Sequence, residues 1–144
     1  MKNAMWPWLN RAFKGHVLLY RVTRGFIGHR FPGAPPMLLL ENVGAKTGKK
    51  RTTPLAYVPD GDKIVLVASK GGNPRNPAWF HNLVANPNTM IQVGSEHRPV
   101  HARVATAEER KTLWPKAVGL YKPYGEYQKK TRREIPLVIL EPRL

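Results

Sequence analysis

The apolar residues near the start of the chain recur with helical spacing. Intervals of three and four place them on one face of a predicted helix over residues 5–24. This stripe consists of Trp6, Leu9, Phe13, Val17 and Tyr20. Basic residues lie off the stripe, so the helix either packs on the rest of the protein or lies flat on an anionic membrane. Glycine and proline residues between 25 and 36 then break the pattern, and we expect a helix and linker at 1–33 ahead of one domain at 34–144.

Beyond residue 36 the apolar residues come in short runs separated by turn formers, which is typical of strands. The predicted strands are 37–40, 54–58, 63–68, 89–93, 100–105 and 137–140. The run at 63–68 is apolar at successive positions, which indicates a strand buried on both faces. A Pro-Asp-Gly-Asp turn at 59–62 joins it to the preceding strand and predicts a hairpin.

Three further segments carry helix signals. Asn76 as the N-cap and Pro77 as the first helical residue predict a short helix over 78–84. Thr106 and Glu109 have the spacing of a capping box, which opens a helix that runs toward Gly119. Residues 124–133 are predicted to form a loop followed by a short helix.

The order of these elements bounds the fold class. The strands are connected mostly as hairpins, and alternating strand–helix–strand units are missing, which argues against a doubly wound parallel sheet. The pattern favours an α+β fold that is mainly β, with a small antiparallel barrel and peripheral helices.

The charge of the chain is one-sided. Of its 144 residues, 24 are Lys or Arg and 9 are Asp or Glu, which gives a formal net charge of +15. This excess indicates an anionic partner, such as nucleic acid, anionic lipid or a highly charged small molecule. Cysteine is absent, which excludes disulfides, thiolate catalysis and Cys-ligated metals. No carboxylate cluster accompanies His97 and His101, so no metal site is expected, and no apolar run reaches the ~18 residues that a membrane span requires.

The stretch GAKTGKKRTTPL at 44–55 is the strongest candidate for chemistry. It sets four cations and three hydroxyls around two glycines, between two apolar runs. Glycine lets backbone N–H groups approach an anion, hydroxyls donate hydrogen bonds, and Lys and Arg add charge. The glycine spacing excludes a P-loop, and no G-x-G-x-x-G fingerprint is present. The residues alone leave two alternatives open, an anion site and a basic turn in a solvated hairpin.

Three segments occur in a distinctive order. They are GAKTG at 44–48 with Arg51 and the Pro-Leu pair at 54–55, ASKGG at 68–72, and NPAWFHNL at 76–83 followed by ANP at 85–87. A later pattern, YxxYxxY at 121–127 with RxIP at 133–136, accompanies them. Together they resemble the deazaflavin-dependent nitroreductase family, whose members use coenzyme F420. The resemblance spans about residues 37–142 and implies a split β-barrel related to flavin-binding oxidoreductases, with an N-terminal helix that can associate with membrane.

The resemblance gives the basic stretch an anionic partner, because coenzyme F420 is a deazaflavin with a ribityl phosphate and a polyglutamyl tail. The residues implied to bind the phosphate and tail are Ala45, Lys46, Thr47, Lys50 and Arg51. Those implied to line the phosphate and ring are Thr52, Thr53, Pro54, Leu55, Ala56, Val67, Ala68, Ser69 and Lys70. Those implied to close over the ring are Pro77, Ala78, Trp79, Phe80, His81, Asn82 and Tyr124. Trp79 would supply a flat apolar wall, and a core aromatic is the alternative.

The resemblance also implies hydride transfer from the reduced coenzyme to a flat, electron-poor acceptor, such as a quinone, a nitroaromatic compound or an unsaturated lactone. Charge develops on an acceptor oxygen, where a hydroxyl can stabilise or protonate it, and the catalytic candidates are Ser69 and Tyr124. The expected substrate residues are Ala56, Tyr121, Tyr124 and Tyr127. Some family members carry a larger aromatic residue near Ala56, which here leaves more room for the acceptor. A tyrosine stripe that only packs on the barrel is the alternative.

We therefore expect an F420-dependent oxidoreductase, foremost a quinone reductase that acts on a menaquinone-like quinone. The expected location is cytoplasmic and peripheral, at the inner face of the plasma membrane through residues 1–24. An FMN-binding reductase of the same fold is the first alternative, and a basic module that binds nucleic acid or membrane is the second. Nucleic-acid binders interleave aromatic with basic residues. The basic stretch has no aromatic residue between Met37 and Ala56, so no nucleic acid is expected.

Overall fold

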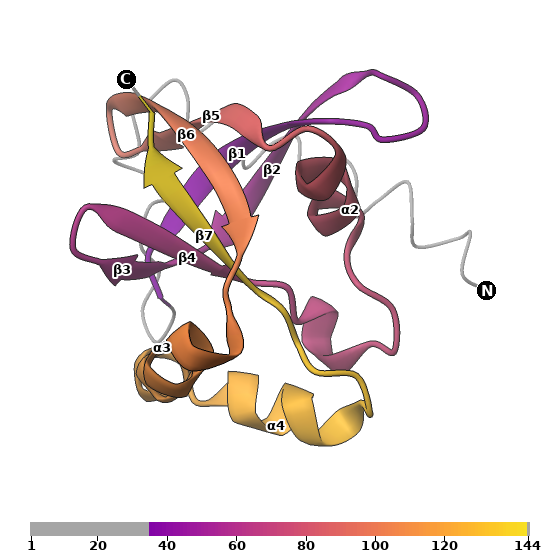
Figure 1. Ribbon diagram of the computed structural model, residues 1–144, viewed down its shortest axis with the longest axis vertical. Helices are drawn as coiled ribbons and strands as arrows, with labels where there is room; N and C mark the ends of the chain where they lie inside the picture. The colour runs from indigo at the N-terminus through magenta and orange to yellow at the C-terminus, as the bar shows by residue number, and fades with distance from the viewer. Residues whose placement is uncertain (1–34, 144) are drawn as a thin grey trace.

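The computed structural model describes residues 35–143, and the predicted helix at 5–24 lies outside them. Within the described residues, seven strands form one curled sheet with helices around it (Figure 1). The strands are β1 (Met37–Val43), β2 (Lys50–Ala56), β3 (Val58–Asp60), β4 (Lys63–Val67), β5 (Asn88–Val93), β6 (Glu96–Val104) and β7 (Leu137–Pro142). The helical elements are η1 (Lys70–Gly72), α2 (Ala78–Ala85), α3 (Ala107–Leu120) and α4 (Pro123–Lys130). None of these helices is long and apolar enough to cross a membrane.

Every neighbouring pair of strands is antiparallel, in the order β2-β1-β5-β6-β7-β4-β3. Consecutive strands form the hairpins β1–β2, β3–β4 and β5–β6, and β7 returns between β6 and β4. The predicted α+β fold with a small antiparallel barrel is confirmed as a curled half-barrel (Figure 1). Among residues 35–143, β2 and β3 are the two edges of the sheet, so the basic stretch, which runs into β2, lies at an edge.

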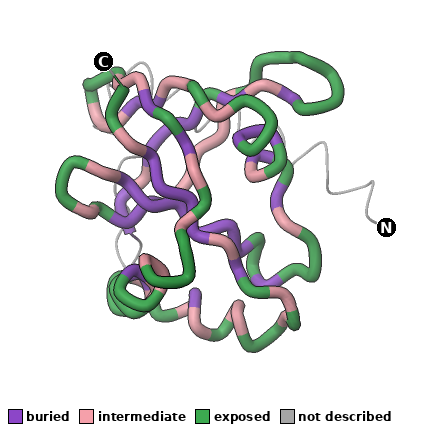
Figure 2. Tube along the Cα trace, viewed as in Figure 1, coloured by how far each residue is buried: buried purple, intermediate pink, exposed green. Residues whose placement is uncertain are grey.

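Alternate residues of β4 and β7 enter two separate cores, because successive side chains of a strand point to opposite faces. The first core contains Ile64 and Leu66 of β4 and is covered by Trp79 and Leu83 of α2. The second core contains Val65 and Val67 of β4 and is covered by Leu113 and Ala117 of α3 and Tyr124 of α4. Both faces of β4 are therefore buried, as its uninterrupted apolar run predicts (Figure 2).

Two predicted boundaries in the first hairpin are wrong. β2 begins at Lys50 instead of residue 54, because pairing with β1 along Val43↔Lys50 to Met37↔Ala56 keeps its polar residues in the strand. The predicted strand 54–58 is also two strands, since the chain leaves β2 after Ala56 and pairs with β4 from Val58 onward. An edge strand tolerates charged residues, which a pattern of apolar runs does not detect.

The helix starts give one confirmation and one correction. Thr106 and Glu109 form the predicted capping box at the start of α3. Asn76 does not cap α2, because Pro77 occupies the cap position and its carbonyl accepts from Phe80 N at 3.1 Å. The Asn76 Oδ1 atom is instead buried with no hydrogen-bond partner among residues 35–143.

Candidate active site

Residues 44–51, called the basic loop below, comprise the turn between β1 and β2 and the first two residues of β2. Gly44 N donates to Lys49 O and Gly48 N donates to Gly44 O, each at 2.8 Å. Gly48 has a φ of +69°, which glycine adopts without steric strain. A Cβ on Gly44 would lie 2.5 Å from Thr47 Oγ1, so any larger residue here would force the Thr47 side chain to move.

The four cations of the basic loop, Lys46, Lys49, Lys50 and Arg51, are all exposed (Figure 2). No carboxylate among residues 35–143 forms an ion pair with any of them. An anion with several charges fits this donor set, because ammonium and guanidinium groups form their strongest hydrogen bonds with carboxylate and phosphate oxygens. The tail and phosphate of the expected coenzyme are such anions.

Strand alternation divides the candidate residues of β2 between two faces. Residues opposite each other on antiparallel strands project to the same side, and Arg51 lies opposite the buried Asn42. One face therefore carries Arg51, Thr53 and Leu55, and the other carries Lys50, Thr52, Pro54 and Ala56. Residues 52–56 are all half-buried, so the residues on each face of the strand keep part of their surface exposed.

The basic loop is hydrogen bonded to α2. Ala45 N donates to Asn82 Oδ1 at 2.9 Å, which joins segments 37 residues apart in the chain. Asn82 is only 7% exposed, and its Nδ2 donates to Asn42 Oδ1 at 2.7 Å. Asn82 is predicted to close over the coenzyme ring, but both ends of its amide are hydrogen bonded within the protein.

The other candidates on α2 differ in exposure. Trp79 is 8% exposed and packs in the first core, which favours the alternative of a core aromatic. Phe80 is half-buried, and its ring stands edge-on to that of His81 with 5.6 Å between centroids. Ala78 and His81 are exposed. The side of α2 that a ligand can reach is therefore the one that carries Ala78 and His81.

Ser69 lies where the two cores meet. Val67 belongs to the second core and Ala68 to the first, and Ser69, 7% exposed, follows them directly. Lys70 has a φ of +46°, a left-handed conformation that residues other than glycine rarely adopt. Strained backbone of this kind is frequent at functional sites. It occurs here in the segment that the resemblance assigns to the coenzyme.

One arginine fixes this segment. The guanidinium of Arg133 donates from Nη1 to Ala68 O at 3.2 Å, from Nη2 to Ser69 O at 2.8 Å and from Nε to Asn73 O at 2.9 Å. Burial lowers the pKa of Arg133 from its ordinary value. Arg133 therefore clamps the chain on both sides of η1 to the connection between α4 and β7.

Sequence reasoning missed the role of Arg133, which it noted only as part of the RxIP pattern. Its three acceptors are backbone carbonyls 60 to 65 residues away. Every residue type carries such a carbonyl, so the sequence does not identify these partners. The clamp is itself braced, since Gln128 Nε2 donates to Arg133 O at 2.7 Å. Gln128 Oε1 in turn accepts from Ile135 N at 2.9 Å.

The three candidate tyrosines gather as their spacing predicts. The ring of Tyr124 lies 5.0 Å from that of Tyr121 and 6.4 Å from that of Tyr127, both in edge-on contact. Tyr124 is 5% exposed, and burial raises its pKa to about 12. The hydrogen bond that Tyr121 shares with Tyr127 raises the pKa of Tyr121. Tyr124 belongs to the second core and Trp79 to the first, so the two are not neighbours in one core.

These contacts join most of the candidate segments into one rim. Figure 1 shows the basic loop, α2, η1 and α4 following one another down one side of the molecule. The Ala45–Asn82 bond joins the basic loop to α2. The hydrogen bonds of Arg133 join the chain around η1 to the connection between α4 and β7. Gly72 of η1 packs directly on α4, because a Cβ there would lie 2.7 Å from Tyr127 O.

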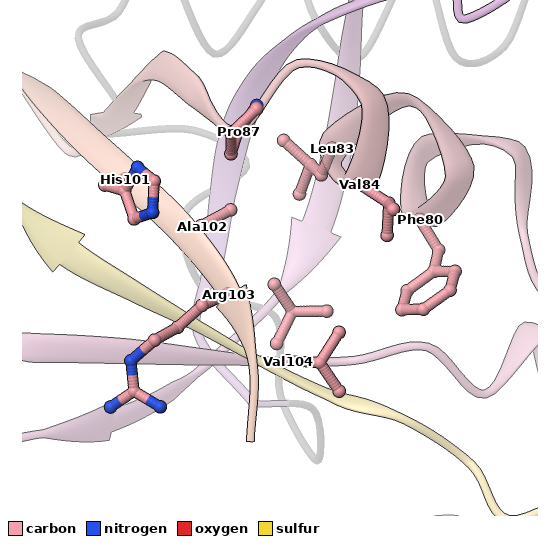
Figure 3. A pocket seen from close by; sticks show the side chains of 9 residues that line it. Phe80, Leu83, Val84, Pro87, His101, Ala102, Arg103 and Val104 are labelled. Carbon is pink, nitrogen blue, oxygen red and sulfur yellow. The ribbon is translucent and has the colours of Figure 1, made fainter. Parts of the chain in front are cut away.

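Two hollows are present among the described residues, and the first borders the rim at α2. One, of about 220 Å³, is apolar and opens where Phe80, Leu83 and Val84 of α2 face Ala102 and Val104 of β6 (Figure 3). The other, of about 480 Å³, is lined by residues of the turns around Asp62 and His97. Of the residues expected at the coenzyme site, only Phe80 lines either hollow.

Comparison with known proteins identifies the family. The sequence pattern of the F420H(2)-dependent quinone reductase family matches residues 12–142. The F420H(2)-dependent quinone reductase Rv1261c of Mycobacterium tuberculosis strain H37Rv is 45% identical over 144 residues, which covers 94% of this chain and 97% of that protein. This agreement confirms the resemblance to F420-dependent oxidoreductases.

Solved structures agree with the sequences. An F420-H2 dependent reductase, FDR-A, superposes with a TM-score of 0.68 at 47% identity, over 74% of this chain and 94% of its own. A domain-swapped dimer superposes with a TM-score of 0.70 at 40% identity, over 94% of this chain and 98% of its own. The haem storage protein HutZ of Vibrio cholerae, at 12% identity and a TM-score of 0.54, shares the fold alone. The fold is the split barrel of flavin reductases, and the chain belongs to the F420H(2)-dependent quinone reductase family.

Proposed function

We propose that this chain is itself an F420H2-dependent quinone reductase and that it binds the coenzyme along the rim from the basic loop to Ser69. The observation that carries this proposal is the Ala45–Asn82 bond, which sets beside α2 four cations that have no acidic partner among residues 35–143. When bound, the reduced coenzyme supplies a hydride. The chain supplies binding, orientation and a proton donor.

The basic loop would hold the anionic end of the coenzyme. The planar guanidinium of Arg51 suits bidentate pairing with a phosphate or carboxylate, and Lys46 and Lys50 act as mobile charges. The hydroxyl of Thr47 and the side chains of Thr52 and Thr53 add neutral donors. These contacts are exposed, so each contributes at most about 1 kcal/mol and weakens with added salt.

The segment at 67–70 would orient the ring. Arg133 fixes the carbonyls of Ala68 and Ser69, so the Ser69 side chain starts from a rigid backbone. A rigid support lowers the entropy lost when the reacting groups align. The Ala78 and His81 side of α2 and the half-buried Phe80 would limit access of water from above.

Tyr124 would hold the proton that the acceptor oxygen needs. Its raised pKa, about 12, keeps the phenol protonated throughout the physiological range. A neutral phenol can donate a hydrogen bond to an oxygen that gains negative charge, which lowers the barrier to reduction. Tyr121 and Tyr127, joined to each other by a hydrogen bond, would wall the acceptor pocket with Ala56.

The acceptor class is a flat quinone, and a menaquinone-like quinone is our specific proposal. Nitroaromatic compounds and unsaturated lactones share the electron-poor, planar shape and are further candidate acceptors. The aromatic and basic residues of 1–24 would bring the protein to an anionic membrane from the cytoplasmic side, where such a quinone resides. FMN is the alternative cofactor, and a yellow protein that releases FMN on heating would favour it. The cations of the basic loop favour the longer anionic tail of F420.

The experiment that tests this function titrates reduced coenzyme F420 into the wild type, Lys46→Ala and Arg51→Ala, and then adds menadione. We expect wild type to bind at micromolar concentration and to reoxidise the coenzyme, measured by absorbance. Each variant should bind about twofold to fivefold more weakly, the effect of one exposed charge contact.

Lys111→Ala is the matched control, because it removes an exposed lysine of α3, a helix that is not part of the rim. It should bind the coenzyme as wild type does. Absence of micromolar binding by wild type rejects the function, and equal affinity in all four proteins moves the tail site away from the basic loop.

Tyr124→Phe should lower kcat about hundredfold while the affinity for the coenzyme changes less than about twofold, since the substitution removes a proton donor and keeps the ring. Steady-state rates with menadione measure both. In wild type, the high pKa of Tyr124 predicts no loss of rate from this group until the pH exceeds about 11.

Tyr57→Phe serves as the control because it removes a hydroxyl from a buried tyrosine of the first core. Its kcat should stay close to that of wild type. Unchanged kcat in Tyr124→Phe would leave Ser69 or solvent as the proton source.

A further inference from the structure

Two asparagines form a buried amide pair between the sheet and α2. Asn42 of β1 is 3% exposed and Asn82 of α2 is 7% exposed. Asn82 Nδ2 donates to Asn42 Oδ1 at 2.7 Å, and Asn42 Nδ2 donates to Thr53 Oγ1 at 3.2 Å. Asn82 Oδ1 accepts from Ala45 N at 2.9 Å. The pair thus links α2, β1, β2 and the basic loop.

The backbone N–H of Ala45 fixes the direction of each hydrogen bond in the series from Ala45 through Asn82 and Asn42 to Thr53. Ala45 N–H can only donate, so the Asn82 atom that meets it must be the oxygen. The amide nitrogen of Asn82 must then face Asn42, whose oxygen accepts, and the nitrogen of Asn42 is left to meet Thr53. Only one orientation of the two amides satisfies all three contacts, so the pair specifies one position of the basic loop.

The pair lies between the two ends of the proposed coenzyme site. On one side, Thr53 lies on the β2 face that also carries Arg51. On the other side, Asn82 belongs to the helix whose exposed side would face the ring. A substitution at the pair would therefore change the distance between the cations and the proposed ring site. It would leave in place the cations of the basic loop and the exposed residues of α2.

We propose that the Asn42–Asn82 pair is a positioning device that sets the basic loop for the anionic tail of the ligand and leaves recognition of the ring to other residues. A loop held at a fixed position loses less conformational entropy when it binds an anion. Without the pair, Ala45 and the exposed cations that follow it would be free to sample other positions. The part of this proposal that concerns the coenzyme rests on the proposed function.

The test is the substitution Asn82→Asp. The aspartate would set a carboxylate oxygen against Asn42 Oδ1, and turning the Asn42 amide over would instead set that oxygen against Leu40 O. The repulsion displaces the side chain that accepts from Ala45 N, so the variant breaks the pair and loosens its hold on the loop. Asn86→Asp is the matched control, because it makes the same change of charge one turn further along the chain at an exposed position. Asn42→Ala is a second variant, which breaks the pair from the other side without adding charge.

The first measurement needs no coenzyme. The basic loop contains four trypsin sites, at Lys46, Lys49, Lys50 and Arg51. We expect trypsin to cut there about tenfold faster in Asn82→Asp and Asn42→Ala than in wild type and Asn86→Asp, because cleavage follows local opening. Mass spectrometry locates the cuts, and thermal melts check that all four proteins are folded. Equal cleavage of the loop in folded variants overturns the proposal.

The second measurement compares coenzyme F420 with its tail-less deazaflavin, which lacks the phosphate and the glutamates. Both Asn variants should bind F420 about tenfold more weakly and the tail-less compound within about twofold of wild type. An equal loss for both ligands overturns the proposal, because the pair would then act on the ring. Faster loop cleavage together with a wild type that binds neither ligand supports the tether and rejects the proposed function alone.

Discussion

Replacing Gly72 by alanine is expected to separate η1 from α4 and to remove most of the activity. The new Cβ would lie 2.7 Å from Tyr127 O and 3.1 Å from Tyr127 Cα, and backbone atoms of a helix cannot step aside as a side chain can. Gly72 also has a φ of +84°, which adds a left-handed penalty of roughly 1–2 kcal/mol for any other residue. With overpacking costs of roughly 1–3 kcal/mol, we expect a loss of about 2–5 kcal/mol in the free energy of unfolding.

Gly71→Ala separates the two causes. Gly71 has a φ of +62° but no atom within 4 Å of the Cβ position, so it carries the backbone penalty alone. Chemical denaturation of both variants, with turnover measured on menadione, should show a mild effect for Gly71→Ala and a much larger one for Gly72→Ala. Equal effects would mean that the contact with α4 is unimportant and that only backbone conformation matters.

Arg133→Gln is expected to lower both stability and turnover, because it removes the clamp on both sides of η1. Three hydrogen bonds from a charged donor are lost, and the carbonyls of Ala68, Ser69 and Asn73 lose their partner. Hydrogen bonds to charged groups contribute about 1.5–3 kcal/mol each, but water reaches part of this site, so we expect about 2–4 kcal/mol in total. The midpoint of thermal unfolding should fall by roughly 5–15 °C.

A positioning role predicts more than lost stability. Measured well below the melting temperature, kcat of Arg133→Gln should fall while the affinity for the tail end of the coenzyme stays close to wild type. Arg132→Gln is the control, since it removes the exposed neighbouring arginine and should leave both quantities unchanged. Arg133→Lys should recover little, because an ammonium cannot reach three carbonyls with a planar fork. A kcat equal to wild type in folded Arg133→Gln would contradict the role.

Short-range sequence patterns predicted much of the secondary structure. Apolar runs located the strands, because short runs bounded by turn residues bury well in a sheet. The capping box located the start of α3, since both of its bonds are made within four residues. The YxxYxxY spacing correctly grouped Tyr124 and Tyr127, which lie one turn apart on α4. Tyr121 lies before α4, at the end of α3, and its contact with Tyr124 depends on the turn between the two helices.

Other features depend on contacts between segments that are distant in the sequence, and the pattern of apolar residues did not predict them. β2 extends back to Lys50 because β1 supplies its hydrogen-bond partners, and polar side chains at a sheet edge carry no apolar signal. Trp79 appeared as a wall for the ring, but its burial depends on how α2 lies on the sheet, which the sequence of α2 does not state. Asn76 lost its expected capping role because the helix begins one residue later, after Pro77.

The sequence by itself determined the composition of the basic loop, its glycines and its cations, and through them the expectation of an anionic ligand. Only the tertiary structure decided where that loop lies and what holds it, since Asn82 and Arg133 bind backbone atoms 37 to 65 residues away. Such partners are N–H and C=O groups that every residue carries, so no residue type marks them in advance. The chemistry of the candidate binding residues can therefore be predicted from the sequence, and their arrangement relative to one another is a property of the fold.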